Sequence, residues 1–180
     1  MTTLETLLTD PETAGSWTLS PDRSEIGFKI KNMWGLIPVK GKFTEFSGQG
    51  QLTGAGTVSG RVDIEAASLN TGIGQRDRHL RSEDFFDVQR FPQISVVVNG
   101  LTPDGGKAAE LQTEFTIKGV TQPVPLLVTI AELDDGSVRI SGKGEIDRTR
   151  FDLDWNKLGV MSDTVTVSAE TVFVRPANSA

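Results

Sequence analysis

Apolar and polar residues alternate along most of the chain. Ile26, Phe28 and Ile30 are separated by single polar or small residues, which is typical of a strand with one buried and one solvated face. The same alternation returns in segments bounded by glycine, proline or Asp-Gly turn signals, and it predicts about eight or nine strands. The later apolar positions are Val58, Val62, Ile64, Ile94, Val96, Val98, Leu111, Phe115, Ile117, Val124, Leu126, Val128, Ile130, Val138, Ile140, Ile146, Val165, Val167 and Phe173.

The alternation also predicts how these strands pair. Parallel sheets are covered on both faces and have continuous apolar runs, so alternation favours antiparallel pairing. A sandwich and a barrel both satisfy this pattern. The charged outer faces leave little to cover an open sheet edge, whereas closing the sheet removes its edges. We therefore expect an all-β fold, an antiparallel barrel of about eight strands with short helices.

In two segments the apolar residues do not alternate with a period of two, and these segments are predicted to contain helices. Thr2 to Glu5 have the spacing of a capping box, and Leu4, Leu7 and Leu8 fall on one helical face. We expect residues 1–15 to form an N-terminal helical extension and residues 16–180 to form the barrel domain. Residues 75–87 are charge-rich without alternation, so we expect a short helix and a turn across one barrel end, with Pro92 at the exit.

Composition and charge narrow the class of protein. The chain has 180 residues, of which 37% are hydrophobic and 23% charged, as in a single soluble globular domain. The N-terminus lacks the basic start and apolar run of a signal peptide, and no stretch is apolar over the roughly 18 residues of a membrane span. We expect a cytoplasmic protein without stable membrane insertion. The net charge of −6 opposes capture by nucleic acid or an anionic membrane, whereas a homodimer stays open.

The residues that usually carry catalysis are sparse. The chain has no cysteine and one histidine, His79, in a polar segment flanked by arginines, which disfavours thiol chemistry, a metal cluster and a catalytic triad. The pairs Asp134-Asp135 and Asp152/Asp154 are better explained by a turn and by the solvated face of a strand. We therefore predict no catalytic residue, no metal ligand and no cofactor.

The apolar inner face of the barrel remains as a candidate site. A barrel of about eight strands is wide enough either to be filled by its own side chains or to hold one small ligand. The aromatic residues fit ordinary packing. Small residues at inward positions instead favour a channel, and Gly142 and Gly144, at alternate positions of one strand, are predicted to border it. A bend or bulge would also explain these two glycines.

Several stretches resemble the YceI-like family of lipid-binding barrels. The most specific are Arg76 to Asp87 followed by Phe91-Pro92-Gln93-Ile94, and Phe115 to Val124 with a turn at Gly119. Asp22 to Phe28 and Val39 to Phe43 are similar to the opening strands of the family, so the resemblance covers roughly Trp17 to Val174. The chain departs from the family in having Arg23, where a histidine is usual, and in Trp34-Gly35-Leu36-Ile37 in place of a short glycine-valine turn.

The resemblance implies an extended lipocalin-like barrel with a hydrophobic tunnel. It implies non-enzymatic binding, transport or storage of a long-chain lipid, such as a polyisoprenoid, a prenyl quinone or a fatty-acid-like chain. Two alternatives are a small enzyme acting on a lipid, with His79 or Asp77 as acid or base, and a structural interaction module whose barrel is packed solid. The residues expected to line the tunnel are Phe28, Ile30, Trp34, Phe43, Ile64, Phe85, Phe86, Ile94, Val96, Phe115, Ile117, Val128, Ile140, Gly142, Gly144, Trp155 and Val167.

Three arginines are candidates for a polar head group of the ligand. Arg76, Arg78 and Arg81 carry guanidinium groups that suit a phosphate. The alternative is that they pair with carboxylates of their own segment and hold it together. These carboxylates are Asp77, Glu83, Asp84 and Asp87.

Overall fold

The computed structural model describes residues 4–32, 37–156, 159 and 161–175. The helices of this part of the chain are α1 (Leu4–Thr9) and α2 (Gly74–Arg81), with short 3-10 helices η1 (Pro21–Arg23), η3 (Ala66–Ser68) and η4 (Arg148–Phe151). The strands are β1 (Gly15–Leu19), β2 (Glu25–Asn32), β3 (Ile37–Phe43), β4 (Phe46–Leu52), β5 (Val58–Glu65), β6 (Leu69–Asn70), β7 (Gln93–Pro103), β8 (Ala108–Ile117), β9 (Val120–Glu132), β10 (Val138–Asp147) and β11 (Thr164–Val174). None of the described helices has the length and apolarity that a membrane span requires.

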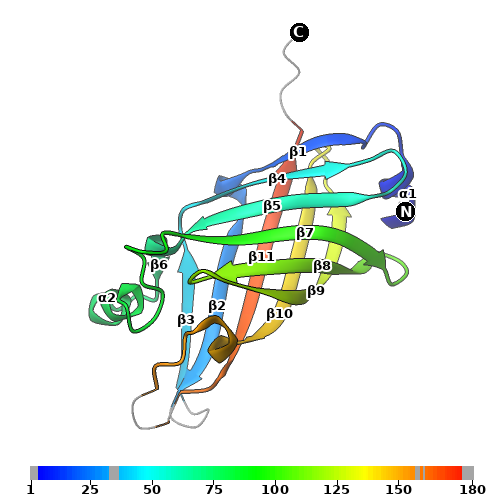
Figure 1. Cartoon of the computed structure of the whole chain (residues 1–180). Helices are drawn as coiled ribbons and strands as arrows, with labels where there is room; N and C mark the ends of the chain where they lie inside the picture. Colours follow the sequence, from blue (N-terminus) through cyan, green and yellow to red (C-terminus); the bar gives the residue numbers. More distant parts are fainter. Residues whose placement is uncertain (1–3, 33–36, 157–158, 160, 176–180) are drawn as a thin grey trace.

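The strands form one sheet that closes on itself. Its order is β1-β4-β5-β7-β8-β9-β10-β11-β2-β3-β6, and an additional pairing of β1 with β11 closes a ring of eight strands. β2 pairs with a different section of β11, Val165 to Glu170. β3 pairs with β2, and β6 pairs with β3. The wall is therefore longer at this end (Figure 1). All described pairings are antiparallel, which confirms the predicted antiparallel eight-stranded barrel.

The period of two decides which side chains enter the barrel. Along β8, Ala109, Leu111, Thr113, Phe115 and Ile117 are buried, and the residues between them are exposed or half-buried. The buried apolar residues form two clusters. The α2-end cluster consists of Phe43, Ile64, Ala66, Leu69, Ile94, Phe115, Ile117, Val124, Ile146, Phe151 and Leu153. The α1-end cluster consists of Leu4, Leu7, Leu8, Trp17, Leu52, Ala109, Leu111, Val128, Ile130 and Val138.

The N-terminal segment is part of the barrel's closure. The three leucines of α1 are buried in the α1-end cluster, so the helix covers this end of the barrel (Figure 1). The indole Nε1 of Trp17 donates a hydrogen bond to the carbonyl of Thr13 at 2.9 Å, which ties the turn after α1 to the first strand. The sheet begins at Gly15, one residue before the predicted start of the barrel domain. At the opposite end, α2 and the turn after it form the predicted crossing segment.

The turn between β8 and β9 needs glycine for two reasons. Lys118 and Gly119 both have positive φ, 52° and 77°, as in the two-residue turns that match the twist of a hairpin. A Cβ atom at Gly119 would also lie 2.9 Å from Cε1 of Phe91. Both the backbone conformation and the ring of Phe91 therefore disfavour a side chain at this position.

Replacing Gly119 with alanine is expected to destabilise the fold more than the same change at Gly136. Both glycines have positive φ, which costs an alanine about 1 kcal/mol. Only at Gly119 does the new methyl group also meet a neighbouring ring, because no heavy atom lies within 4 Å of the Cβ position at Gly136. Urea unfolding of the two variants measures the difference, and equal midpoints would contradict the close contact with Phe91.

Candidate ligand-binding cavity

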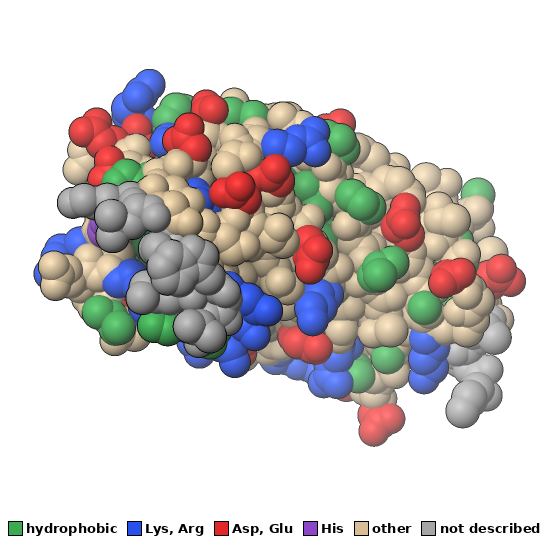
Figure 2. Space-filling model, turned by 90° about the horizontal axis from the view of Figure 1, so that it is seen from below, with side chains coloured by type: hydrophobic (Ala, Val, Ile, Leu, Met, Phe, Trp, Pro, Cys, Tyr) green, Lys and Arg blue, Asp and Glu red, His purple; other side chains and the backbone are tan. Residues whose placement is uncertain are grey.

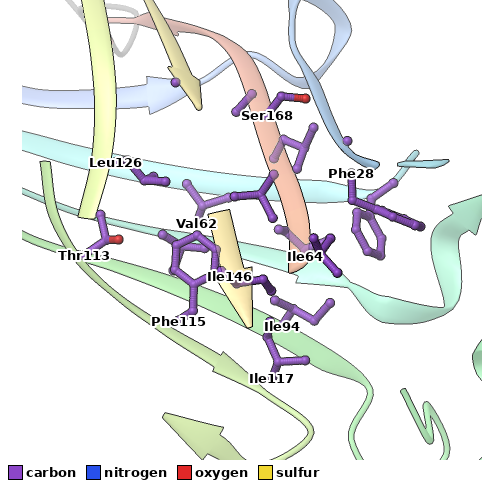
Figure 3. Close-up of a pocket in the computed structure, with 18 of the residues that line it drawn as sticks. Phe28, Val62, Ile64, Ile94, Thr113, Phe115, Ile117, Leu126, Ile146 and Ser168 are labelled. Carbon is purple, nitrogen blue, oxygen red and sulfur yellow. The ribbon is translucent and has the colours of Figure 1, made fainter. Parts of the chain in front are cut away.

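The interior of the barrel contains an apolar cavity of about 220 Å³ (Figure 3). Its wall comes mainly from the inward positions of β2, β5 and β7 to β11, because alternate residues of these strands face the barrel axis. Residues that represent this wall in Figure 3 are Phe28, Val62, Ile64, Ile94, Thr113, Phe115, Ile117, Leu126, Ile146 and Ser168. A cavity with such a wall suits an apolar ligand.

The threonine hydroxyl groups of the wall are bonded to the protein itself. Thr113 donates its hydroxyl hydrogen bond to the carbonyl of Val124 on the neighbouring strand. Thr171 does the same to the carbonyl of Ile140, at 2.9 Å. These two donors are therefore not available to a ligand, and the largely apolar wall discriminates among ligands chiefly by shape and apolar contact.

Most residues expected to line a tunnel do lie in the wall of this cavity. They are Phe28, Ile30, Phe43, Ile64, Phe85, Phe86, Ile94, Val96, Phe115, Ile117, Val128, Ile140, Gly142 and Val167. Trp34 lies outside the described residues. Gly144 and Trp155 are described, and neither lines the cavity.

At Gly144 the expectation was wrong because a neighbouring side chain fills the space. A Cβ atom there would lie 2.6 Å from Cδ2 of Leu126 and 3.3 Å from the carbonyl oxygen of Pro125. Leu126 itself lines the cavity, so it stands between Gly144 and the open space. Gly142 differs, because a Cβ atom there would meet only Val128, at 3.3 Å, and the glycine borders the cavity.

Trp155 packs on the outer side of the α2-end wall. Its ring meets His79 edge to face, with centroids 4.5 Å apart, and lies 5.3 Å from the ring of Phe85, which lines the cavity. His79 Nε2 lies 2.9 Å from Oδ2 of Asp84. The histidine therefore supports the aromatic cluster. The part of the chain that the structure describes has no group of three metal-ligating side chains.

Two of the candidate head-group arginines are bound to main-chain carbonyls. Arg76 donates from Nη2 to the carbonyl of Thr71, at 2.9 Å. Arg81 donates from Nε to the carbonyl of Ala67 and from Nη2 to that of Leu69, at 2.9 and 2.8 Å. These bonds hold α2 against η3 and β6.

The alternative, in which these arginines pair with carboxylates of their own segment, therefore does not hold for Arg76 and Arg81. Asp77 accepts hydrogen bonds from the N–H and the hydroxyl of Thr71, and Asp84 contacts His79. Asp87 forms its ion pair with Arg90, at 3.5 Å. Within the described ranges no ion pair involves Glu83. Arg78 is exposed.

Arg23, at the family's usual histidine position, forms polar contacts with the turn between β9 and β10. Its Nη1 pairs with Oδ2 of Asp135 at 3.0 Å, and its Nη2 donates to the hydroxyl of Ser137 at 3.2 Å. Hydrogen bonds from Ser137 and the charge of Arg23 lower the pKa of Asp135 to about 2. Arg23 thus fastens η1 to the turn between β9 and β10, and it does not line the cavity.

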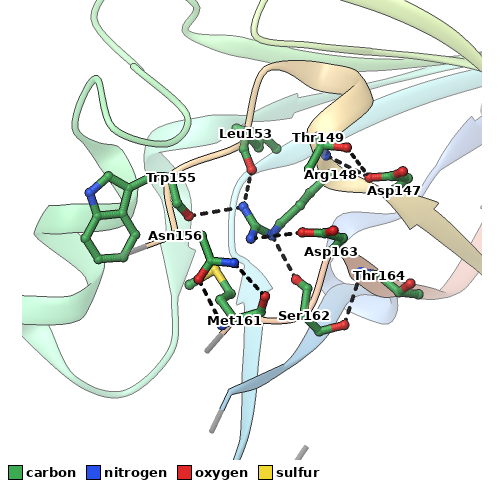
Figure 4. A network of polar contacts seen from close by, with 10 residues as sticks. All are labelled: Asp147, Arg148, Thr149, Leu153, Trp155, Asn156, Met161, Ser162, Asp163 and Thr164. Carbon is green, nitrogen blue, oxygen red and sulfur yellow. Dashed lines mark hydrogen bonds and ion pairs between the residues drawn. The ribbon is translucent and has the colours of Figure 1, made fainter. Parts of the chain in front are cut away.

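Arg148 is a site residue that the sequence interpretation missed. Its side chain is 2% exposed and reaches the cavity wall (Figure 4). Nε donates to the carbonyl of Ser162 at 2.8 Å, and Nη1 donates to those of Leu153 and Trp155. Nη2 lies 3.4 Å from Oδ1 of Asp163.

The burial of Arg148 has an electrostatic cost that its partners offset. Desolvation lowers the pKa of the guanidinium, and the charge of Asp163 opposes this shift. Arginine stays charged under such shifts because its ordinary pKa is very high. The signal for this residue was its position, since Arg148 continues the inward parity of Ile146 past the end of β10.

A closed antiparallel barrel with an apolar interior defines a lipocalin-like class of protein. Within that class the chain belongs to the YceI-like domain family, whose pattern it matches over residues 17–173. α1 lies outside this range. A UPF0312 protein of Pseudomonas savastanoi pv. phaseolicola is 30% identical over 106 residues, 58% of this chain and 55% of that protein. The chain thus matches about half the length of this relative.

Solved structures share the fold. BcnA of Burkholderia cenocepacia aligns with a TM-score of 0.79 at 24% identity, over 86% of this chain and 98% of that chain. A polyisoprenoid binding domain from Saccharophagus degradans aligns with a TM-score of 0.74 at 18% identity, over 89% and 98%. The YceI protein of Campylobacter jejuni aligns with a TM-score of 0.66 at 25% identity, over 77% and 86%.

Replacing Arg148 with methionine is expected to destabilise the protein by about 2 kcal/mol or more, because it leaves buried carbonyl groups without their donor. Arg150 is the matched control, since it is exposed and donates only to the side chain of Gln122. Its replacement should change stability by less than about 0.5 kcal/mol. Chemical unfolding measures both variants, and equal losses would contradict the anchoring role of Arg148.

Proposed function

We propose that this protein binds a long-chain lipid inside the barrel and carries or stores it without chemical change. The ligand class is a polyisoprenoid, a prenyl quinone or a fatty-acid-like chain, and no other cofactor is needed. The observation that carries the proposal is the apolar cavity enclosed by the wall of the barrel. Each CH₂ group that leaves water for such a cavity contributes about 0.8 kcal/mol, so a long chain binds tightly with few polar contacts.

A second apolar cavity of about 120 Å³ is evidence for a ligand that is longer than the main cavity. It lies at the α1 end, where Leu7, Leu8 and Trp17 contribute to its wall. The two cavities share five wall residues: Val62, Val98, Leu111, Ile140 and Phe173. We propose that a long chain extends from the main cavity past these residues towards α1.

Family membership supports binding as the function. The chain shares its fold with a Saccharophagus degradans domain that is known as polyisoprenoid binding. The two residues considered for acid-base catalysis lie outside the cavity wall, and both have structural partners. Asp77 accepts hydrogen bonds from Thr71, and His79 contacts Asp84. The geometry therefore favours a binding protein over an enzyme, and the cavity argues against a solidly packed barrel.

The direct test is to identify what the protein carries. Protein purified from cells is analysed by native mass spectrometry, and its lipids are extracted and identified. Delipidated protein is then offered a prenyl quinone, a polyprenyl phosphate and palmitic acid in turn. We expect a lipid-loaded mass and uptake of at least one of these chains. Recovery of the ligand-free mass alone, together with no uptake of any of them, would overturn the proposal.

Replacing Gly142 with leucine is expected to reduce lipid uptake about tenfold or more, because the new side chain projects into the cavity. The fold should persist, since Val128 is the only neighbour within 4 Å of the new Cβ atom. Gly54→Leu is the control, because it makes the same change where the Cβ position has no neighbour within 4 Å. A folded Gly142→Leu variant with full uptake would show that the ligand binds elsewhere.

A further inference from the structure

The outer face of β2 and β3 carries a concentration of positive charge. Half of the chain's eight lysines lie on these two strands: Lys29, Lys31, Lys40 and Lys42. We call these four residues the lysine patch. Figure 2 shows basic side chains gathered beside the grey residues at the end of the molecule where β2 and β3 extend the wall.

The strand register places the four side chains on one surface. Phe28 and Ile30 line the cavity. Lys29, between them, and Lys31, the next residue, therefore point outward. On β3, Val39 and Phe43 are buried, which turns Lys40 and Lys42 outward in the same way. Lys29 and Lys40 are direct cross-strand partners, a position where Cβ atoms lie about 5 Å apart.

This arrangement is unfavourable for the folded protein by itself. Like charges directly opposite each other on neighbouring strands destabilise a sheet. No ion pair found among the described residues involves any lysine of the patch. The outward residues of the adjoining strand β11 beside these lysines, Thr164 and Thr166, are uncharged. The carboxylates Glu25 and Glu170 face each other at the far end of β2. Positive charge is therefore segregated on this surface and left uncompensated.

Protection of a sheet edge explains only part of the patch. β3 pairs with β6 at Lys42 and Phe43 alone, so the described structure leaves Ile37 to Gly41 without a partner on that side. Lysine on such an edge prevents pairing with another chain. β2, however, is paired with β11 on one side and β3 on the other. Lys29 and Lys31 protect no edge, so they need another explanation.

We propose that the outer face of β2 and β3 docks on the surface of an anionic lipid bilayer. The net charge of −6 would repel the molecule as a whole from such a surface, but a local group of lysines attracts anionic head groups within a Debye length. Ile37, at the start of β3, is 52% exposed and adds an apolar contact beside the patch. The inner side of the same wall borders the cavity, which places the candidate ligand site next to the membrane that would supply it.

The test is sedimentation of the 180-residue protein with phospholipid vesicles. Vesicles of phosphatidylcholine alone are compared with vesicles that also contain phosphatidylglycerol. We expect binding to the second kind only, weakened by added salt. Lys29→Glu/Lys40→Glu is expected to lose at least tenfold in apparent affinity. Lys107→Glu/Arg139→Glu, which changes the net charge equally at two exposed positions elsewhere, should bind as the parent does.

The single variant Lys29→Glu separates docking from a structural role. It replaces a repulsive cross-strand pair with an attractive one, so its thermal midpoint should rise while vesicle binding falls. Lipid uptake measured in detergent solution should be unchanged in all three variants, so a failure here is distinct from a failure of the proposed function.

Three results would overturn the docking proposal. The first is that the parent protein binds neither kind of vesicle. The second is that the Lys29→Glu/Lys40→Glu and Lys107→Glu/Arg139→Glu variants lose binding equally, which would make net charge the cause. The third is that duplex DNA displaces the protein from vesicles at concentrations comparable to those of the anionic lipid, which would mark the patch as a general polyanion site.

Discussion

The closure of the sheet is the constraint on which the rest of this structure depends. Pairing of β1 with β11 at Thr18 and Leu19 closes the eight-stranded ring, and the inner face of this ring is almost entirely apolar. The side chains of that face do not fill the space they enclose, and a cavity of about 220 Å³ lies among them. Apolar cavity surface costs stability, and a ligand that binds only the folded state restores it. Fold stability and ligand binding are thus linked through the same residues.

The two ends of the barrel are held by different interactions. At the α1 end, Leu4, Leu7 and Leu8 close the interior mainly by apolar packing, and the N–H of Leu4 donates a hydrogen bond to the carbonyl of Gly106 at 3.0 Å. At the α2 end, arginines bound to main-chain carbonyls fix the segments that surround the cavity: Arg81 holds α2, and Arg148 holds the chain between η4 and β11. The α1 end thus depends mainly on apolar packing, and the smaller cavity lies next to it.

The period of two was sufficient to predict the barrel and most of the cavity wall, because strand geometry fixes which face each side chain occupies. It could not predict what fills the space in front of that face. Gly144 has the predicted parity, but Leu126 from the neighbouring strand covers it. Alternation along a strand also does not predict which group a long side chain will bind. Arg76 and Arg81, for example, bind main-chain carbonyl groups rather than the nearby carboxylates. Arg148 was visible as a charged residue at an inward position, yet its partners lie up to 15 residues later in the sequence.

The central claim is that the barrel interior itself holds the lipid. Nuclear Overhauser effects between an unlabelled prenyl quinone and ¹³C-labelled isoleucine methyl groups test it most directly. The account predicts contacts to Ile64, Ile94 and Ile146, which line the cavity, and none to Ile73, which is 53% exposed outside it. A loaded protein whose ligand contacts Ile73 and none of the three inner isoleucines would contradict the account.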